Sequence, residues 1–356
     1  MCEMLSRRHV EIGLAPLGAI GMSVFSIDLY FACRSLPPAD MMGLAAFVAQ
    51  PAHWRVMADL GLLALFAGLY SVPMYALIQL RSPAMHRARI IAANNIINEV
   101  FMIASSVIAG ALLSMNATIP QIFLFTGIAN ALVAFYIFML VPEYLLRFVA
   151  WVISHFVYRF KVTGDDHIPT TGPAILVCNH VSYVDAVLLM AASPRPIYFI
   201  MDHRIFAVPM LGWLFKLAKA IPIAPRTENP QAYEAAFAAA TRILQEGDLL
   251  AIFPEGGLTR DGTLQEFKGG IMKILEQTQS LGIGGAAGVP VVPMALTNLW
   301  GSFFSRVEAG SAMAQPFRRG FLSRVGLVVG TPLAAAEVQP EVLRLRVKAL
   351  LGETQR

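Results

Sequence analysis

The hydrophobic positions of the chain form two different patterns, which meet near residue 142. On the N-terminal side, apolar residues gather into four stretches that approach the roughly 20 residues needed to cross a hydrocarbon core. They cover about residues 12–33, 60–80, 100–115 with a backward extension through 91–97, and 121–141. Residues 1–142 are therefore predicted to form an all-α segment of about four transmembrane helices.

On the C-terminal side, from about Lys161, short β-rich runs alternate with helical patterns. Buried strands are predicted at Ala174–Val177, Ile197–Ile200, Leu249–Phe253 and Val289–Met294. Strands separated by helices predict an α/β domain with a mixed, largely parallel sheet over residues 161–356. Loops that carry function are then expected at the carboxyl ends of the strands.

One helix of this domain has clear end signals. Asn229 is a good N-cap, Pro230 suits the first helical position, and Gly247 follows the helical run Gln231–Gln245. A short terminal helix is predicted from about Pro340 to Lys348.

The junction between the two patterns, residues 143–160, is rich in aromatic residues. Arg147 and Arg159 stand near the ends of its run Tyr144–Phe160. Aromatic and basic side chains favour the membrane–water interface. This stretch is therefore predicted to be a helix that lies in the membrane surface.

Composition and charge support the same division. Apolar residues make up 56% of the 356 positions and charged residues 14%, against roughly 45–50% and roughly 25% in soluble domains. Residues 1–141 hold 7 Arg, no Lys and 6 acidic residues, whereas residues 142–356 hold 20 basic and 17 acidic ones. The net charge of +4 comes without a long basic run, which argues against a nucleic-acid partner and suits an anionic membrane surface.

Cysteine usage and the N-terminus set further bounds. Cys2, Cys33 and Cys178 are too few and too scattered for a disulfide framework or a zinc site, so we expect a reducing compartment and no metal. A signal-peptide layout is missing, because Arg7 and Arg8 precede an apolar stretch long enough to stay in the membrane.

The placement of arginines predicts an orientation. One set of helix flanks holds only Arg34 and Arg55, and the other holds Arg7, Arg8, Arg81, Arg87, Arg89 and Arg147. Because basic residues concentrate on the cytoplasmic side, both termini and the α/β domain are predicted to be cytoplasmic, on a multi-pass protein of the inner (cytoplasmic) membrane.

Several polar residues lie in or at the ends of the apolar stretches, where they are costly: Asp28, Asp59, Asn94, Asn95, Asn98, Glu99 and Asn130. They are compatible with a transport path, or with helix ends and hydrogen bonds between helices. Four helices are few for a carrier built of repeats, which favours the second interpretation.

The strongest candidate chemistry follows the first predicted strand, in Cys178-Asn179-His180-Val-Ser-Tyr-Val-Asp185. If a helix begins near Ser182, Asp185 lies in its first turn and can reach back to His180. A carboxylate holds an imidazole in one tautomer and leaves its other nitrogen free to take a proton from a hydroxyl. His180 is thus a candidate general base for O-acyl transfer, with an ordinary core or loop histidine as the alternative.

A second group of candidates follows the strand Leu249–Phe253, in Pro254-Glu255-Gly256-Gly257-Leu-Thr259-Arg260-Asp-Gly262. Adjacent glycines let backbone N–H groups approach an anion, and a nearby Arg supplies charge for a phosphate. A Gly-rich turn with a solvated charge is the alternative. Arg226 follows another apolar run, and Lys268 stands in Phe267-Lys268-Gly269-Gly270.

Together these segments resemble the glycerolipid acyltransferase family, which includes lysophosphatidate acyltransferases, over about residues 160–335. The family's four motifs are an Asn-His followed by four residues and Asp, an Arg after apolar residues, Phe-Pro-Glu-Gly, and an apolar strand with Pro. They are matched in order by Asn179-His180 with Asp185, by Arg226, by Phe253–Gly256 and by Val289–Pro293.

The resemblance implies His180 as base, Asp185 as the residue that orients it, and a set of substrate-binding residues: Asn179, Arg226, Glu255, Gly256, Arg260 and Lys268. It implies no cofactor, with a preformed thioester, acyl-CoA or acyl carrier protein, as co-substrate. Two departures from the family pattern occur. Gly257 and Leu258 displace Thr259-Arg260 by two positions, which resembles the acyltransferase halves of bifunctional lysophospholipid acyltransferase/acyl-carrier synthetases, and Asp202-His203-Arg204 stands in place of a lysine.

A second resemblance covers about residues 1–142. Gly68–Gln79 and Arg87–Asn95 are similar to the tenth helix and following loop of major-facilitator lysophospholipid transporters. This chain would carry the last four of the twelve helices of that family.

The sequence therefore predicts a membrane-bound O-acyltransferase. It would move a fatty acyl group from the thioester to the hydroxyl of a lysophospholipid or 1-acylglycerol-3-phosphate, in phospholipid synthesis or remodelling. The alternative is a lysophospholipid transporter or flippase component with an accessory acyltransferase domain.

Overall fold

The computed structural model describes residues 14–34, 36, 42–207, 212, 215, 218, 220–302, 304–305 and 322–353. The chain divides into two compact units, Met1–Phe148 and Val149–Arg356. The division falls inside the stretch 143–160 that was expected to be an interfacial helix. Arg7 and Arg8, which entered the prediction of orientation, lie outside the described residues.

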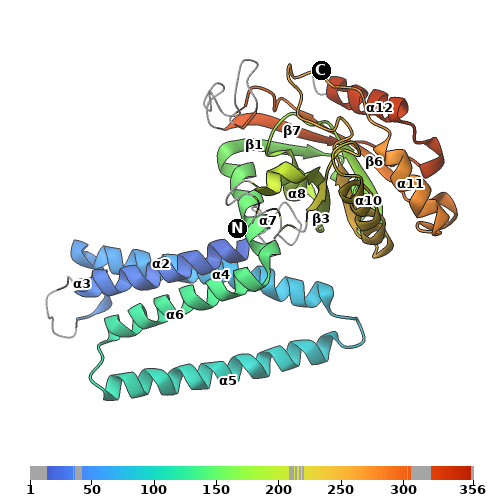
Figure 1. Cartoon of the computed structure of the whole chain (residues 1–356). Coiled ribbons are helices and arrows are strands. Elements are labelled where there is room, and N and C mark those ends of the chain that lie inside the picture. Colours follow the sequence, from blue (N-terminus) through green and yellow to red (C-terminus); the bar gives the residue numbers. More distant parts are fainter. Residues whose placement is uncertain are drawn as a thin grey trace. The chain divides into compact units, whose positions relative to one another are not determined.

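The N-terminal unit is built of helices (Figure 1). Its long helices are α2 (Leu14–Arg34), α4 (Trp54–Arg81), α5 (Arg87–Ser114) and α6 (Ile119–Leu140), and α3 (Leu44–Ala49) with the 3₁₀ turn η1 (Pro51–His53) joins α2 to α4. Over the described residues, all four predicted apolar stretches are therefore helical. Each is long and apolar enough to cross a membrane.

Helix α2 packs against α4 and α6. Small residues permit the close approach to α4, because a Cβ at Gly18 would lie 2.6 Å from the backbone nitrogen of Tyr70, and one at Gly21 would enter the ring of Phe66. On the α6 side, the Asn130 amide donates to the Ala19 carbonyl at 2.9 Å. Such packing is the usual way for apolar helices to associate in lipid.

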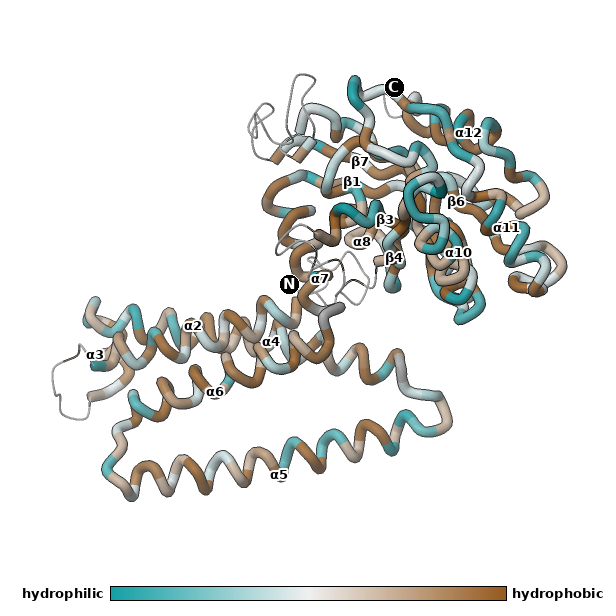
Figure 2. The backbone as a smooth tube through the Cα atoms, viewed as in Figure 1, coloured by the Kyte–Doolittle hydropathy of each residue, from teal (hydrophilic) through white to brown (hydrophobic). Residues whose placement is uncertain are grey.

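Helix α5 contrasts with α2, since none of its residues is buried. The tube of Figure 2 changes between teal and brown along α5, and the successive apolar residues Val100, Phe101, Met102 and Ile103 are all exposed. Four consecutive residues point to all sides of a helix, and apolar exposure on every side is typical of a membrane span.

The C-terminal unit corrects the predicted interfacial helix. Helix α7 (Pro142–Val152) ends in the π-helical turn η2 (Ile153–Val157), and strand β1 (Tyr158–Thr163) follows. The aromatic side chains of Tyr158 and Phe160 are buried, because β1 pairs in parallel with β7 (Ser323–Val329). Their apolar surface is covered by the protein's own core, so at this end of the stretch the helix prediction was wrong.

The described part of this unit holds a seven-stranded sheet with the order β1-β7-β6-β2-β5-β3-β4. The remaining strands are β2 (Ala174–Cys178), β3 (Ile197–Asp202), β4 (Ile221–Ile223), β5 (Leu249–Ile252) and β6 (Val291–Thr297). Among these described strands, only β6 and β7 pair in an antiparallel way, so the predicted mixed, largely parallel sheet is confirmed. The three strands that were not predicted are β1, β4 and β7.

Helices cover both faces of the sheet. Helix α8 (Asp185–Ala192) shares one core with Leu176 and Cys178 of β2. Helices α10 (Pro230–Gln245), α11 (Gly270–Ser280) and α12 (Pro340–Glu353) share the other core with Ile175 and Val177. Because β2 is buried on both faces, its run is continuously apolar. The short turns η3 (Asp165–His167), η4 (His203–Ala207), η5 (Gly285–Ala287) and η6 (Ala335–Glu337) lie in the connections.

The sheet positions two loops side by side. Strands β2 and β5 are parallel neighbours, so their carboxyl ends meet at one edge. The loop after β2 begins at Asn179, and the loop after β5 begins at Phe253. The predicted N-cap of α10 is also confirmed, since the Asn229 side chain accepts the N–H of Ala232 at 2.9 Å.

Candidate active site

His180 and Asp185 form the pair that the sequence predicted. The imidazole Nδ1 lies 2.8 Å from Asp185 Oδ2. Since a carboxylate only accepts hydrogen bonds, Nδ1 is the donor and Nε2 carries the lone pair. The side chain of His180 is 22% exposed and that of Asp185 is 0% exposed, so the base can meet a substrate while its partner stays out of solvent.

The carboxylate of Asp185 also shapes the loop. Its Oδ2 accepts the backbone N–H groups of Val181 at 2.7 Å and Ser182 at 3.0 Å. Helix α8 begins at Asp185, three residues later than predicted, because this turn occupies residues 181–184. Burial raises the pKa of Asp185, opposed by the hydrogen bonds from His180 and the two amides.

An aromatic ring supports the imidazole from the β5 side. The ring of Phe253 stacks on that of His180, with centroids 4.3 Å apart and planes inclined by 16°. Phe253 is itself stacked near Phe199, 6.3 Å away. The His180 ring is thus held by a carboxylate at its edge and a phenyl ring on its face.

The backbone of His180 is held on both sides by the loop after β5. Its N–H donates to Glu255 Oε1 at 2.7 Å, and its carbonyl accepts the N–H of Thr259 at 2.9 Å. The other carboxylate oxygen of Glu255 accepts the N–H of Gln265 at 2.9 Å. Burial raises the pKa of Glu255, and these two amides oppose that rise.

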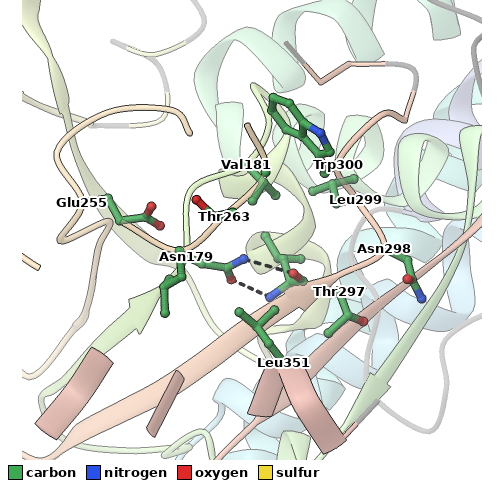
Figure 3. Close-up of a pocket in the computed structure, with 12 residues that line it drawn as sticks. Asn179, Val181, Glu255, Thr263, Thr297, Asn298, Leu299, Trp300 and Leu351 are labelled. Carbon is green, nitrogen blue, oxygen red and sulfur yellow. Dashed lines mark hydrogen bonds between the residues drawn. The ribbon is translucent and has the colours of Figure 1, made fainter. Parts of the chain in front are cut away.

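Asn179 connects the catalytic loop to β6. Its amide donates to the carbonyl of Leu296 at 3.1 Å and accepts the N–H of the same residue at 2.7 Å. Both hydrogen bonds are drawn in Figure 3. Asn179 is 2% exposed, so its side chain is engaged within the protein, and a contact of that side chain with substrate stays a prediction.

Lys268 lies against the glycine of the third motif. Gly256 has a φ of +69°, and a Cβ there would collide with the Lys268 ammonium. The backbone N–H of Lys268 also donates to the Pro254 carbonyl at 2.9 Å. A positive charge is therefore placed beside the exposed Gly256 at the edge of the site.

The two predicted arginines are less tightly placed. Arg226 and Arg260 are both exposed, and no hydrogen bond or ion pair of the described residues involves either side chain. Arg226 follows β4, and Arg260 follows the buried Thr259. The structure thus brings His180, Asp185, Asn179, Glu255, Gly256 and Lys268 together, whereas the contribution of the two arginines stays a prediction.

A cavity of about 270 Å³ adjoins the loop after β2 at Asn179 and Val181 (Figure 3). Asn179, Val181 and Glu255 line it, together with Thr263 and Leu264, the β6 end Leu296–Trp300, and Leu351 of α12. Trp300 closes over Gly262, where a Cβ would lie 2.7 Å from its ring. Among the described residues, no group of three or more His, Cys, Asp or Glu is placed to hold a metal ion.

Sequence reasoning missed three contributors to the site. Phe253, Thr259 and Gln265 touch His180 or Glu255 through a ring face or a backbone N–H. Phe253 stands in a predicted motif, but a stacking partner carries no pattern of its own in the chain. Thr259 and Gln265 act through backbone N–H groups that every non-proline residue has, so no side-chain signal marks them.

Comparison with known proteins points to one family. Residues 159–297 match the family model described as Acyltransferase. This part of the α/β unit is thus similar to acyltransferase domains. The match runs from β1 to the end of β6 and includes the residues from Asn179 to Lys268 described above, whereas the cavity residues Asn298, Leu299, Trp300 and Leu351 lie beyond it.

Curated relatives carry one enzyme name. The 1-acyl-sn-glycerol-3-phosphate acyltransferase of Limnanthes douglasii is 34% identical over 150 residues, which cover 42% of this chain and 48% of the relative. The chloroplastic 1-acyl-sn-glycerol-3-phosphate acyltransferase LPAT1 of Arabidopsis thaliana is 28% identical over 140 residues, 39% of this chain and 36% of the relative. The chain thus spans about a third to a half of the length of these relatives.

A solved structure was also found, the crystal structure of the 1-acyl-sn-glycerophosphate (LPA) acyltransferase PlsC from Thermotoga maritima. It is 19% identical, with a TM-score of 0.43, and the superposition covers 60% of this chain and 78% of that chain.

Proposed function

We propose that this protein is a membrane-anchored O-acyltransferase of glycerophospholipid metabolism. It transfers a fatty acyl group from a thioester, acyl-CoA or acyl carrier protein, to the hydroxyl of a lysophospholipid or 1-acylglycerol-3-phosphate. The observation that carries the proposal is the His180–Asp185 pair, with Nδ1 bonded at 2.8 Å and Nε2 left without a partner among the described residues. The family match and the names of the relatives support the same reaction class.

The reaction needs one proton acceptor and no protein nucleophile. As the acceptor's hydroxyl oxygen attacks the thioester carbonyl carbon, its proton passes to His180 Nε2. Asp185 stabilises the imidazolium that forms. When the tetrahedral intermediate collapses, the C–S bond breaks and the departing sulfur takes the proton from Nε2, which restores the neutral base.

Cys178 is unsuited to form an acyl-enzyme. It is 0% exposed at the end of β2, and burial raises the pKa of its thiol well above the usual value. Since the thiolate is the nucleophilic form, this cysteine serves as a small core residue.

Positive charge for the acceptor's phosphate comes from Lys268, with Arg226 and Arg260 as further contributors. The Lys268 ammonium lies against Gly256. Gly256 directly precedes Gly257 and Leu258, the two residues that displace Arg260. An anion bound at exposed backbone beside this ammonium would lie at the same sheet edge as His180.

The N-terminal helices supply the membrane anchor. Four of them meet the length and hydropathy of a membrane span, and we place the chain in the cytoplasmic membrane as a multi-pass protein with its α/β unit on the cytoplasmic side. The acyltransferase domain then has access to both the lipid acceptor and a cytosolic thioester.

The first prediction tests the base directly. Purified protein is assayed with a labelled acyl thioester and lysophospholipid, and His180→Ala should lower the rate by roughly 10²–10⁴-fold. Asp185→Asn should also lose most activity, because the amide cannot support the imidazolium.

His167→Ala is the matched control. His167 bonds the Val329 carbonyl at 3.0 Å and follows β1, which runs opposite to β2 and so ends at the other edge of the sheet. Its activity should be unchanged. Equal turnover of the His180 and His167 variants would remove His180 as base.

The transporter alternative has its own outcome in this assay. Some polar groups of the helices form contacts between helices, such as Asn98 with the Tyr75 hydroxyl at 2.9 Å and Arg55 with Asp28 at 2.5 Å. Their engagement supports an anchor. Lysophospholipid movement across vesicles without any thioester-dependent product would instead favour a carrier, to which the resemblance to major-facilitator transporters points.

A further inference from the structure

Both backbone polar groups of His180, its N–H and its carbonyl, are hydrogen-bonded to the loop after β5. The Glu255 carboxylate accepts its N–H at 2.7 Å, and the Thr259 N–H donates to its carbonyl at 2.9 Å. Both partners come from the loop after β5. The pairing of β2 with β5 brings this loop alongside the loop that carries the base.

The two partners are hydrogen-bonded and largely buried, although Glu255 also lines the cavity described above. Glu255 is 4% exposed and Thr259 is 0% exposed. Each Glu255 oxygen has a backbone N–H donor, from His180 and from Gln265 at 2.9 Å. A carboxylate in this position has little surface left to offer a substrate.

Thr259 is in turn fixed by its own side chain. Its hydroxyl donates to the Thr263 carbonyl at 2.9 Å and accepts the N–H of Gly262 at 3.1 Å. Asp261 Oδ1 lies 3.1 Å from the same hydroxyl and accepts the N–H of Thr263 at 2.9 Å. The turn of residues 259–263 therefore holds the Thr259 N–H in a set direction.

Fixing the peptide groups on both sides of residue 180 fixes the direction of its Cα–Cβ bond. Asp185 then sets the ring's rotation through Nδ1, and Phe253 stacks on its face. The position of Nε2 follows from these restraints together. Misplacement of a reacting group by about 1 Å can cost about 10²-fold in rate.

We infer that Glu255 and Thr259 are positioning residues that clip the backbone of His180 in place for proton transfer. Gly257 and Leu258, the two residues by which the chain departs from the family pattern, lie between them in the sequence. The clip assigns Glu255 a task other than the substrate contact that the family resemblance implies. This inference rests on the proposed transferase function.

The test separates positioning from binding by kinetics. Glu255→Gln keeps the shape but offers one acceptor oxygen, and its NH₂ group faces an N–H donor. We expect kcat to fall by roughly 10–100-fold, while the KM values for acceptor and thioester stay within about twofold. Glu266→Gln, the same change at an exposed position of the same loop, should leave both parameters unchanged.

A second pair of variants keeps the inference testable if Glu255→Gln does not fold, as judged by near-ultraviolet circular dichroism. Thr259→Val removes the hydroxyl that orients the clip, and Thr259→Ser retains it. We expect kcat to fall in the valine variant and to be largely restored in the serine variant, again at constant KM.

The outcomes are distinct. An active wild type with a raised acceptor KM and an unchanged kcat in Glu255→Gln would overturn the clip in favour of substrate contact. Unchanged kinetics in both Glu255→Gln and Thr259→Val would also overturn it. A wild type without thioester-dependent transfer to any acceptor would remove the proposed function itself, and with it the premise of the clip.

Discussion

At the scale of single residues, the site shows how strongly local backbone governs side-chain chemistry. Gly256 takes a φ of +69° and leaves room for the Lys268 ammonium, whereas a Cβ added at Gly257 would meet no atom within 4 Å, and its φ is not positive. Two adjacent glycines are therefore unequal. The first is required by its conformation and its neighbour, and the second is open to substitution.

The second prediction follows from this difference between Gly256 and Gly257. Gly256→Ala should strain the backbone and push the ammonium away, which raises the acceptor's KM more than the thioester's. Gly257→Ala is the matched control and should behave like the wild type. Steady-state kinetics with each substrate varied in turn gives the answer. Equal effects of the two alanines would mean that Lys268 has no part in binding the acceptor.

The buried carboxyls make the third prediction, on pH. Burial raises the pKa values of Asp185 and Glu255 in the folded protein, so the folded state holds these protons more tightly than the unfolded chain. Their contribution to stability is present below the unfolded pKa values and is lost as pH rises through the raised folded ones. Over the same pH range the carboxylate forms of Asp185 and Glu255, which accept the N–H groups, become more populated. Activity should therefore rise with pH while the contribution of these two groups to stability falls.

Thermal unfolding of wild type and Glu255→Gln across mildly acidic to neutral pH measures the effect. The variant removes one of the two titrating groups, so its midpoint should depend less on pH. Glu266→Gln provides the control, with the pH dependence of the wild type. A Glu255→Gln curve parallel to that of the wild type would show that Glu255 does not titrate differently on folding.

At the scale of elements, the connections between the helices can test the predicted orientation of the chain across the membrane. The α4–α5 connection lies between Arg81 and Arg87, with Arg89 close behind. The α5–α6 connection, Met115–Thr118, has no basic residue. Basic flanks stay cytoplasmic. Each connection offers one exposed methionine, Met85 at 90% and Met115 at 76%, which makes a matched pair of sites.

The fourth prediction uses this pair. In a chain whose own cysteines have been replaced, Met115→Cys should react with a membrane-impermeant maleimide in intact cells, and Met85→Cys should react only after the cells are opened. Labelling followed by gel shift is the measurement. The reversed pattern would place the α/β unit outside the cytoplasm, away from a cytosolic thioester.

At the scale of the whole molecule, the fifth prediction concerns the independence of the α/β unit. It has its own cores on both faces of the sheet, and all proposed catalytic residues follow Cys178. Deletion of residues 1–142 should therefore leave a folded protein that acylates lysophospholipid in micelles or vesicles. It should lose salt-resistant attachment, because four candidate spans are removed and charge attraction to headgroups is screened by salt.

Vesicle flotation at low and high salt, run beside the transfer assay, checks both parts. The remaining α7 is expected to give reversible binding only. A folded, vesicle-bound fragment that is inactive, beside an active whole chain, would mean that the helices deliver substrate or complete the site, and the transporter alternative would gain support.

Local patterns determined much of this protein from the sequence alone. The four apolar helices follow from the length of their hydrophobic runs, and the α10 cap follows from Asn229 and Pro230. The His180–Asp185 pair was also accessible, because its members are five positions apart and share one turn. In each case the interacting groups are near neighbours in the chain, so spacing carries the information.

Tertiary structure decided what depends on distant partners. The composition of the aromatic run ending at Phe160 suits a membrane surface as well as a protein core. Only pairing with Ser323–Val329 made Tyr158 and Phe160 buried strand residues. The clip on His180 likewise joins residues 75 positions apart. Backbone N–H and C=O groups are alike at nearly every position, so only the folded sheet selects which of them meet.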